Sequence, residues 1–144
     1  MGGVGERERV TQNRIVKLFR DKLKYNYLGN LHDRENSNID EERLKGYLSS
    51  QGYSDELIRR AINSLVDAAK KPDLYYANKE VYSLLRYGAS VRENVSAHNQ
   101  AVKFINWEEP YKNNFYIAEE VTVMGEHTKR PDIVLYINGI AVCV

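Results

Sequence analysis

The sequence predicts an α+β fold, with helices in the first part of the chain and a largely antiparallel sheet in the second. Up to about residue 87, apolar residues recur at helical spacing in four segments. After that point, short segments with strand-like alternation follow one another without helices between them. With 144 residues, 42% hydrophobic and 28% charged, the chain is long enough for one core and has an ordinary globular composition.

The first helix is expected from Thr11 to about Lys24. Its apolar residues at helical spacing are Ile15, Leu18, Phe19 and Leu23. Residues 1–10 are rich in glycine and then charged, which is typical of a flexible leader. Residues 25–37 are polar, contain Gly, Asn and Asp, and are expected to end the helix.

Three further helices are predicted by caps and apolar stripes. Asn38 is the expected cap of the second helix, which Gly52 ends, and Ser54 caps the third, which ends near Lys70. The fourth runs over residues 77–87. The residues expected to face the core are Leu44, Tyr47 and Leu48, then Leu57, Ile58, Ala61, Ile62, Leu65 and Val66, and finally Val81, Leu84 and Leu85.

The turn between the second and third helices, residues 51–54, would also suit a helix-turn-helix. In that arrangement Arg59, Arg60, Lys70 and Lys71 could contact phosphates. We favour an αα-hairpin with solvated basic residues, because the two arginines are flanked by apolar positions and no cluster of base-reading polar residues accompanies them.

The strand segments begin with residues 102–107 and continue with a second strand from Phe115 to Val123. The last part of the chain is the most clearly organised. Asp132 is followed by five apolar residues, then Asn138-Gly139, then five more apolar residues. This pattern predicts a hairpin of two buried strands at the centre of the sheet, with Asp132 at the mouth of a central strand.

Several segments resemble the nuclease domain at the N-terminus of type I restriction enzyme R subunits, within the PD-(D/E)xK superfamily. They are Arg130 to Val142, Leu84 to Gly88, Phe104 to Trp107, Asn114-Phe115 and Tyr27 to Leu31. The resemblance implies a helical lead-in over residues 11–76, followed by the N-terminal part of a restriction-endonuclease-like core over residues 77–144. It also implies that the chain ends within the catalytic hairpin, before the Glu-x-Lys half of the motif.

The resemblance makes Asp132 the first metal ligand, although Pro131-Asp132 alone is also a common turn at the start of a strand. Glu120 lies where R subunits often carry glutamine, so it is either an extra metal ligand or a surface residue, and we favour the surface. Glu80, on the helix before the sheet, could join the metal site or could be a solvated glutamate that suits the helix dipole.

The activity implied by the resemblance is Mg²⁺-dependent hydrolysis of DNA phosphodiester bonds. Asp132 would supply one ligand, and the Glu and Lys expected past Val144 would supply a second ligand and a cation. The implied partners are double-stranded DNA and the modification and specificity subunits, with ATP used only by motor domains outside this chain. The 144-residue chain alone is then expected to be inactive.

A different class of function is a non-catalytic nucleic-acid-binding or subunit-docking module that keeps a relic nuclease fold. The net charge of +1 does not decide between the two, because DNA contacts could come from a local patch. Cys143, in an apolar strand, predicts a buried free thiol in a reducing compartment, and no segment predicts export or membrane insertion, so we expect a cytoplasmic protein. His32, His98 and His127 lack the spacing of a zinc site, and no phosphate-binding glycine motif occurs.

The hairpin also permits a prediction about its register. Strand side chains alternate faces, so Asp132 can share a metal with a Glu two positions past Val144 only if both lie on one face. A two-residue turn pairing Ile137 with Ile140 in a regular ladder would place them on opposite faces. We therefore predict a three-residue loop pairing Tyr136 with Ile140 or, failing that, a β-bulge, with Gly139 at positive φ.

Overall fold

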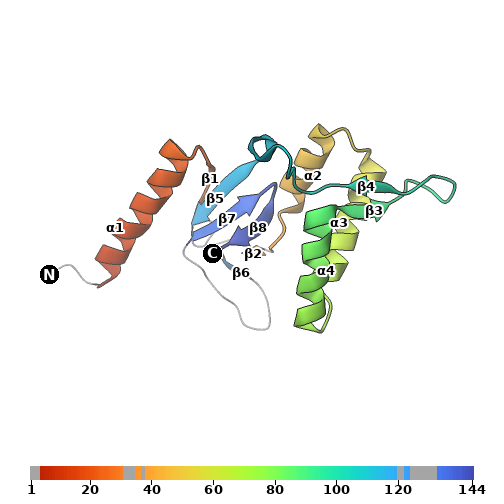
Figure 1. The fold of residues 1–144 in the computed structure, drawn as a ribbon. Coiled ribbons are helices and arrows are strands. Elements are labelled where there is room, and N and C mark those ends of the chain that lie inside the picture. The colour runs from red at the N-terminus through yellow and green to blue at the C-terminus, as the bar shows by residue number, and fades with distance from the viewer. Residues whose placement is uncertain (1–3, 31–34, 37, 120–121, 124–132) are drawn as a thin grey trace. The chain divides into compact units, whose positions relative to one another are not determined.

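The computed structural model describes residues 4–30, 35–36, 38–119, 122–123 and 133–144 (Figure 1). The chain forms two compact units. Residues 1–40 and 114–144 make up unit 1, and residues 41–113 make up unit 2. The boundary expected between residues 76 and 77 falls inside a helix of unit 2.

Unit 1 contains a mixed, mainly antiparallel sheet, as the sequence predicts (Figure 1). Its strands are β1 (Asn26–Asn30), β5 (Phe115–Glu119), β7 (Ile133–Ile137) and β8 (Ile140–Cys143), in the order β1-β5-β7-β8. β1 runs parallel to β5, whereas β5, β7 and β8 pair antiparallel. A two-residue pair, β2 (Glu35–Asn36) and β6 (Thr122–Val123), is also parallel. Ala118, Val134 and Tyr136 form a buried cluster on one face of the sheet.

The N-terminal helix differs from its prediction. α1 (Val4–Lys17) begins inside the expected leader and continues as a π-helical turn over Leu18–Lys22. The N-terminal half of α1 is rich in Glu and Arg, which are good helix formers. The prediction of a flexible leader, which rested on the glycine and charge content, is therefore wrong for these residues. Among residues 7–17 of α1, Gln12 and Val16 are buried, whereas Ile15 and, in the π-helical turn, Leu18 are exposed although they belong to the predicted apolar stripe.

The polar segment expected to be a break contributes the edge strand β1. Two Asn and one Gly among its five residues disfavour a strand, so we attribute the strand to its pairing with β5. Asn38 was wrongly predicted as a helix cap, because α2 begins only at Glu41. The carbonyl of Asn38 instead accepts a hydrogen bond from the backbone N of Ala141 at 2.8 Å, and Ile39 forms a bridge with Ile140.

Unit 2 contains three helices and a short hairpin. The elements are α2 (Glu41–Ser50), α3 (Asp55–Ala69), α4 (Leu74–Tyr87), β3 (Ala89–Val91), β4 (Gln100–Val102) and a 3-10 turn (Pro110–Lys112). The predicted stripes of α2 and α3 are buried apart from Val66, which is half-buried, and Ser54 caps α3 by accepting from the N of Leu57 at 3.4 Å. α4 begins three residues earlier than expected, because Asp73 caps it.

The exposed basic residues of α3 are paired within the helix. Arg59 and Arg60 both contact Glu56, at 2.6 Å and 2.7 Å. Hydrogen bonds from the two guanidinium groups lower the pKa of the Glu56 carboxyl to about 2. These pairs agree with the αα-hairpin interpretation of α2 and α3, in which the arginines are solvated.

The strand predicted over residues 102–107 is wrong beyond Val102, and β3, which pairs with β4, was not anticipated. Phe104 and Ile105 are nevertheless buried. Their loop is held by the Asn113 side chain, which donates to the carbonyl of Asn106 at 2.8 Å and accepts from the Asn106 N at 2.8 Å. A side chain therefore replaces the strand partner that these apolar residues led us to expect.

Candidate functional site

The β7–β8 hairpin, which carries the predicted site, has a two-residue turn and a β-bulge. Ile137 pairs with Ile140 across Asn138 and Gly139, whose φ values are 53° and 93°. This is a type I′ turn, and the predicted three-residue loop is wrong. The alternative prediction of a bulge is confirmed, because Tyr136 pairs with Ala141 but the next pair is Leu135 with Cys143, which leaves Val142 extra. The positive φ of Gly139 is also confirmed.

β7 is a central strand, as predicted, but β8 is not. Apart from the bridge between Ile39 and Ile140, no strand among the described residues pairs with the outer side of β8. Val142 is 46% exposed. Cys143 is likewise exposed, so the prediction of a buried thiol is wrong.

The hairpin turn is fixed by contacts from two other segments. Asn138 is fully buried, its Oδ1 accepts from the backbone N of Asn114 at 2.7 Å, and its own N donates to the Asn114 carbonyl at 2.8 Å. On the other side, the backbone N of Asp40 donates to the carbonyl of Gly139 at 2.7 Å. The register of β7 and β8 is therefore set by tertiary contacts as well as by the turn.

We expect Asn138→Ala to destabilise the chain by about 2 kcal/mol, because the half-buried N–H of Asn114 would lose its acceptor and Ala tolerates positive φ poorly. Asn138→Gly is the matched variant, since it loses the same acceptor but accepts the backbone conformation. Urea unfolding should rank the stabilities as wild type, then Gly, then Ala. An Ala variant as stable as the wild type would contradict the structural role of this side chain.

A buried carboxylate that sequence reasoning did not single out lies at the end of β5. Glu119 is 6% exposed and pairs with Ile133 in the sheet. The hydroxyl of Tyr27, from β1, donates to Glu119 Oε2 at 2.5 Å, and Gln12 Nε2, from α1, lies 3.4 Å from Oε1. Arg20 lies over the Tyr27 ring, with Cζ 4.8 Å from the ring centre.

The electrostatics of this cluster keep the phenol protonated. Burial, and then the hydrogen bond to Glu119, raise the pKa of Tyr27 to about 12. Glu119 shares a sheet face with Ile117, whereas Ala118 and Val134 lie on the other face. The Tyr27–Glu119 pair therefore ties β1 to β5 in a small pocket that Arg20 and Lys17 also line.

Of the three predicted site residues, the structure describes one. Asp132 and Glu120 lie outside the described residues. Glu80 is described, on α4 in unit 2, where it forms an ion pair with Lys71. Within the described ranges, no group of three His, Cys, Asp or Glu side chains could hold a metal ion. The metal roles of Asp132, Glu120 and Glu80 therefore stay predictions.

The comparison with protein families decides the assignment of the chain. Residues 5–144 match the family described as type I restriction enzyme R protein N terminus. The chain belongs to this family. The match includes the bulged hairpin and its Asn-Gly turn. It confirms the resemblance to R-protein N termini that the sequence indicated.

A curated relative of this R-protein N terminus gives the same indication. The chain is 31% identical over 108 residues to a Methanocaldococcus jannaschii protein named "Putative type I restriction enzyme MjaVIIIP endonuclease subunit". The match covers 72% of this chain but only 10% of the relative, so the chain spans about a tenth of that protein's length. No solved structure matches the chain. In the part of the chain that the structure describes, no helix is long and apolar enough to cross a membrane.

Proposed function

We propose that this R-protein N terminus contributes Asp132 to a Mg²⁺-dependent nuclease site that cleaves DNA phosphodiester bonds. Family membership supports a nuclease, and the printed name of the relative describes an endonuclease subunit. The observation that carries the proposal is the bulge in the hairpin, because it changes the register by one residue between Tyr136 and Leu135.

We infer that this bulge supports a shared metal site, because a shift of one residue is what the parity argument requires. Continuing the register of Leu135 and Cys143 would pair position 132 with the second position after Val144, where the motif places its Glu. A two-residue turn without a bulge would place these two positions on opposite faces.

The donor set suits a hard cation. Carboxylate oxygens are the ligands that Mg²⁺ prefers, and a single carboxylate rarely holds it alone, so we propose that Asp132 acts with the acid after Val144. When bound, the metal polarises the phosphate and makes water nucleophilic near neutral pH. The role of Asp132 is to hold the cation at the mouth of β7.

We further propose that the full-length protein is a soluble cytoplasmic subunit that acts on double-stranded DNA with modification and specificity subunits, and that ATP-driven motor domains move the DNA before cleavage. This N-terminal region would then contribute little to the choice of the DNA sequence that is cleaved. This part of the proposal rests on the family alone.

The test is cleavage of plasmid DNA by the full-length subunit within its complex, with Mg²⁺ or with a chelator in its place. We expect cleavage with Mg²⁺ and none with the chelator, because the proposed site has no other means of activating water. Absence of cleavage under conditions where ATP is hydrolysed would favour the alternative, a non-catalytic module with a relic nuclease fold.

A further inference from the structure

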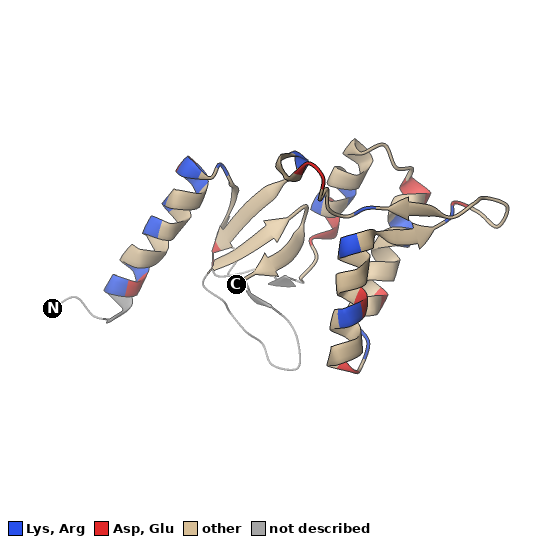
Figure 2. Cartoon of the chain, viewed as in Figure 1, with Lys and Arg blue, Asp and Glu red and all other residues tan. Residues whose placement is uncertain are grey.

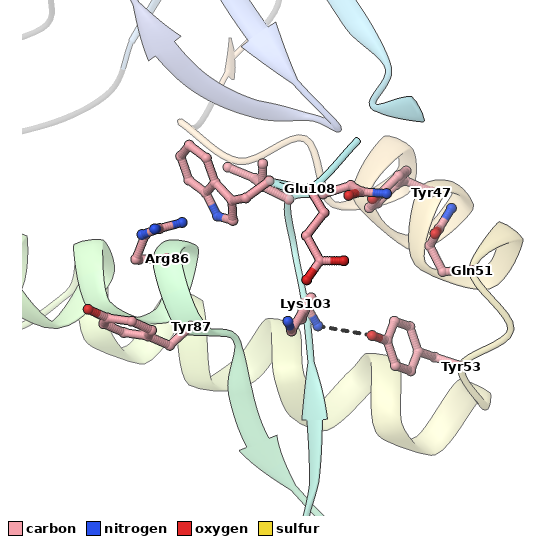
Figure 3. Close-up of a pocket in the computed structure, with 10 residues that line it drawn as sticks. Tyr47, Gln51, Tyr53, Arg86, Tyr87, Lys103 and Glu108 are labelled. Carbon is pink, nitrogen blue, oxygen red and sulfur yellow. Dashed lines mark hydrogen bonds between the residues drawn. The ribbon is translucent and has the colours of Figure 1, made fainter. Parts of the chain in front are cut away.

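Unit 2 contains a pocket of about 570 Å³ that no part of the proposed nuclease site uses (Figure 3). It is lined by the turn between α2 and α3, the end of α4 and the loop after β4. The lining residues that carry the argument are Tyr53, Arg86, Tyr87, Lys103, Trp107 and Glu108. Pockets for small ligands commonly have volumes of about 300 to 1,000 Å³, so a nucleotide unit would fit.

Two aromatic side chains that line this pocket are exposed to solvent. Tyr87 is 70% exposed and Trp107 is 49% exposed. The indole is nevertheless fixed, because its Nε1 donates to the carbonyl of Leu85 at 2.9 Å and Arg86 Cζ lies 5.1 Å from its ring centre. A fixed and partly exposed indole is the kind of platform on which an unpaired nucleobase stacks.

The charged groups of the pocket favour a single phosphate. Arg86 and Lys103 are cationic, and Glu108 is the acid among the lining residues. Figure 3 shows the Glu108 side chain extending toward Lys103. On α4 as a whole, acidic and basic positions are mixed (Figure 2), so the cations act locally and do not form a long basic stripe. A carboxylate beside them could accept a hydrogen bond from the N3–H of a thymine base.

The loop that carries Lys103 and Trp107 is held in place before any ligand binds. Phe104 anchors it in the core with 0% exposure, and the backbone N of Lys103 donates to the Tyr53 hydroxyl at 3.1 Å (Figure 3). The Asn113 side chain holds the far end of the loop through Asn106. A rigid loop lowers the cost of ordering the pocket on binding.

We propose that this pocket binds an unpaired base of single-stranded DNA, with the base stacked on Trp107 and Tyr87 and the adjoining phosphate contacted by Arg86 and Lys103. Base faces are covered by their neighbours in a duplex, so a stacking pocket selects unpaired strands. None of the lining residues named here belongs to the proposed nuclease site, and the binding that we propose needs no metal and adds a second DNA contact to the proposed function.

Trp107 is the one tryptophan of the chain, so the tryptophan fluorescence reports on this pocket. Titration of the 144-residue chain with oligothymidylate of about 12 nucleotides, in a buffer with chelator, should quench the indole fluorescence to a plateau. Binding should weaken as salt rises, because phosphate contacts release counterions. The same length of blunt duplex should bind more weakly. Since no cleavage is measured, this experiment can fail while the nuclease proposal stands.

Variants can distinguish DNA binding in the pocket from non-specific binding through the charge of the protein. Tyr87→Ala should weaken binding by about 5- to 150-fold, the range expected for loss of one stacked base. Arg86→Gln and Lys103→Gln should each weaken it and reduce its salt dependence. Lys79→Gln, on the same helix but outside the lining residues, removes the same charge and should leave binding unchanged. Thermal unfolding of each variant shows whether it is folded.

The proposal would be overturned by the absence of saturable quenching, by equal binding of duplex and single strand, or by a loss in Lys79→Gln as large as in Arg86→Gln. Thymidine monophosphate that binds as tightly as the oligonucleotide would also overturn it, because the pocket would then recognise a free nucleotide.

Discussion

In the full-length subunit, Asp132→Asn is expected to abolish DNA cleavage while ATP hydrolysis and translocation continue. The amide keeps the size of the side chain but removes the charge that holds the proposed Mg²⁺. Metal stabilisation of a phosphoryl transition state is worth several kcal/mol, and about 1.4 kcal/mol corresponds to a factor of ten in rate. The loss should therefore be at least about a thousandfold.

The measurement compares plasmid linearisation with ATPase rate in the assembled complex. Glu80→Gln is the matched control, because it makes the same change from carboxylate to amide on a residue whose partner is Lys71. We expect that control to cleave normally, and a loss of cleavage in it would make Glu80 part of the metal site. Glu120→Gln should also cleave, because we predict that Glu120 is a surface residue. If Asp132→Asn lost ATPase activity with its fold intact, the separation of the two roles would be wrong.

The sequence predicted those parts of the fold in which local and tertiary preferences agree. α3 is such a case, because its Ser54 cap and its apolar stripe both appear in the structure. The hairpin is another, because the apolar runs on both sides of Asn138-Gly139 pair as β7 and β8 with Gly139 at positive φ, although the turn has two residues and not the three that parity led us to predict. Local signals of this strength are seldom overridden.

Other elements depend on partners that are distant in the sequence. β1 is a strand because β5 lies beside it, and its residues 26–30 carry no strand pattern of their own. Phe104 and Ile105 have a strand-like pattern but lie in a buried loop that the side chain of Asn113 holds through Asn106. The pairing of β1 with β5 joins residues that no local window contains, whereas the contact between Asn106 and Asn113 spans only seven residues but follows neither helical nor strand periodicity.

The candidate site shows the same division. Parity arguments predicted that the hairpin needs a shift of one residue, and the structure supplies it at Val142 and not in the turn. Glu119 was not singled out from the sequence, because its partners Tyr27 and Gln12 are distant in the chain. A signal was present in the alternation of β5, where Glu119 falls in phase with Phe115 and Ile117.

The second large effect concerns stability. Gly88→Ala is expected to destabilise the chain by about 3 kcal/mol, because the residue has φ 87° and ψ 169°, a region that costs other residues about 1–3 kcal/mol. An added Cβ would also lie 2.7 Å from the carbonyl oxygen of Val102, which is backbone and cannot rotate away. Relieving this clash would move β4, and further cost of the kind seen in overpacked cores would follow.

Gly46→Ala is the matched control for this substitution. Gly46 lies inside α2, is exposed and has no heavy atom within 4 Å of an added Cβ, so Ala should stabilise the helix by about 0.5–1 kcal/mol. Urea unfolding should therefore move the two midpoints in opposite directions with similar slopes. Because Gly88 separates Tyr87 from β3 and contacts Val102 next to Lys103, the Ala variant should also lose the fluorescence response of Trp107 to oligothymidylate. A Gly88→Ala protein with an unchanged midpoint would show that the β4 backbone yields at this point, and that the pocket beside it is less rigid than the contacts of Phe104 and Asn113 indicate.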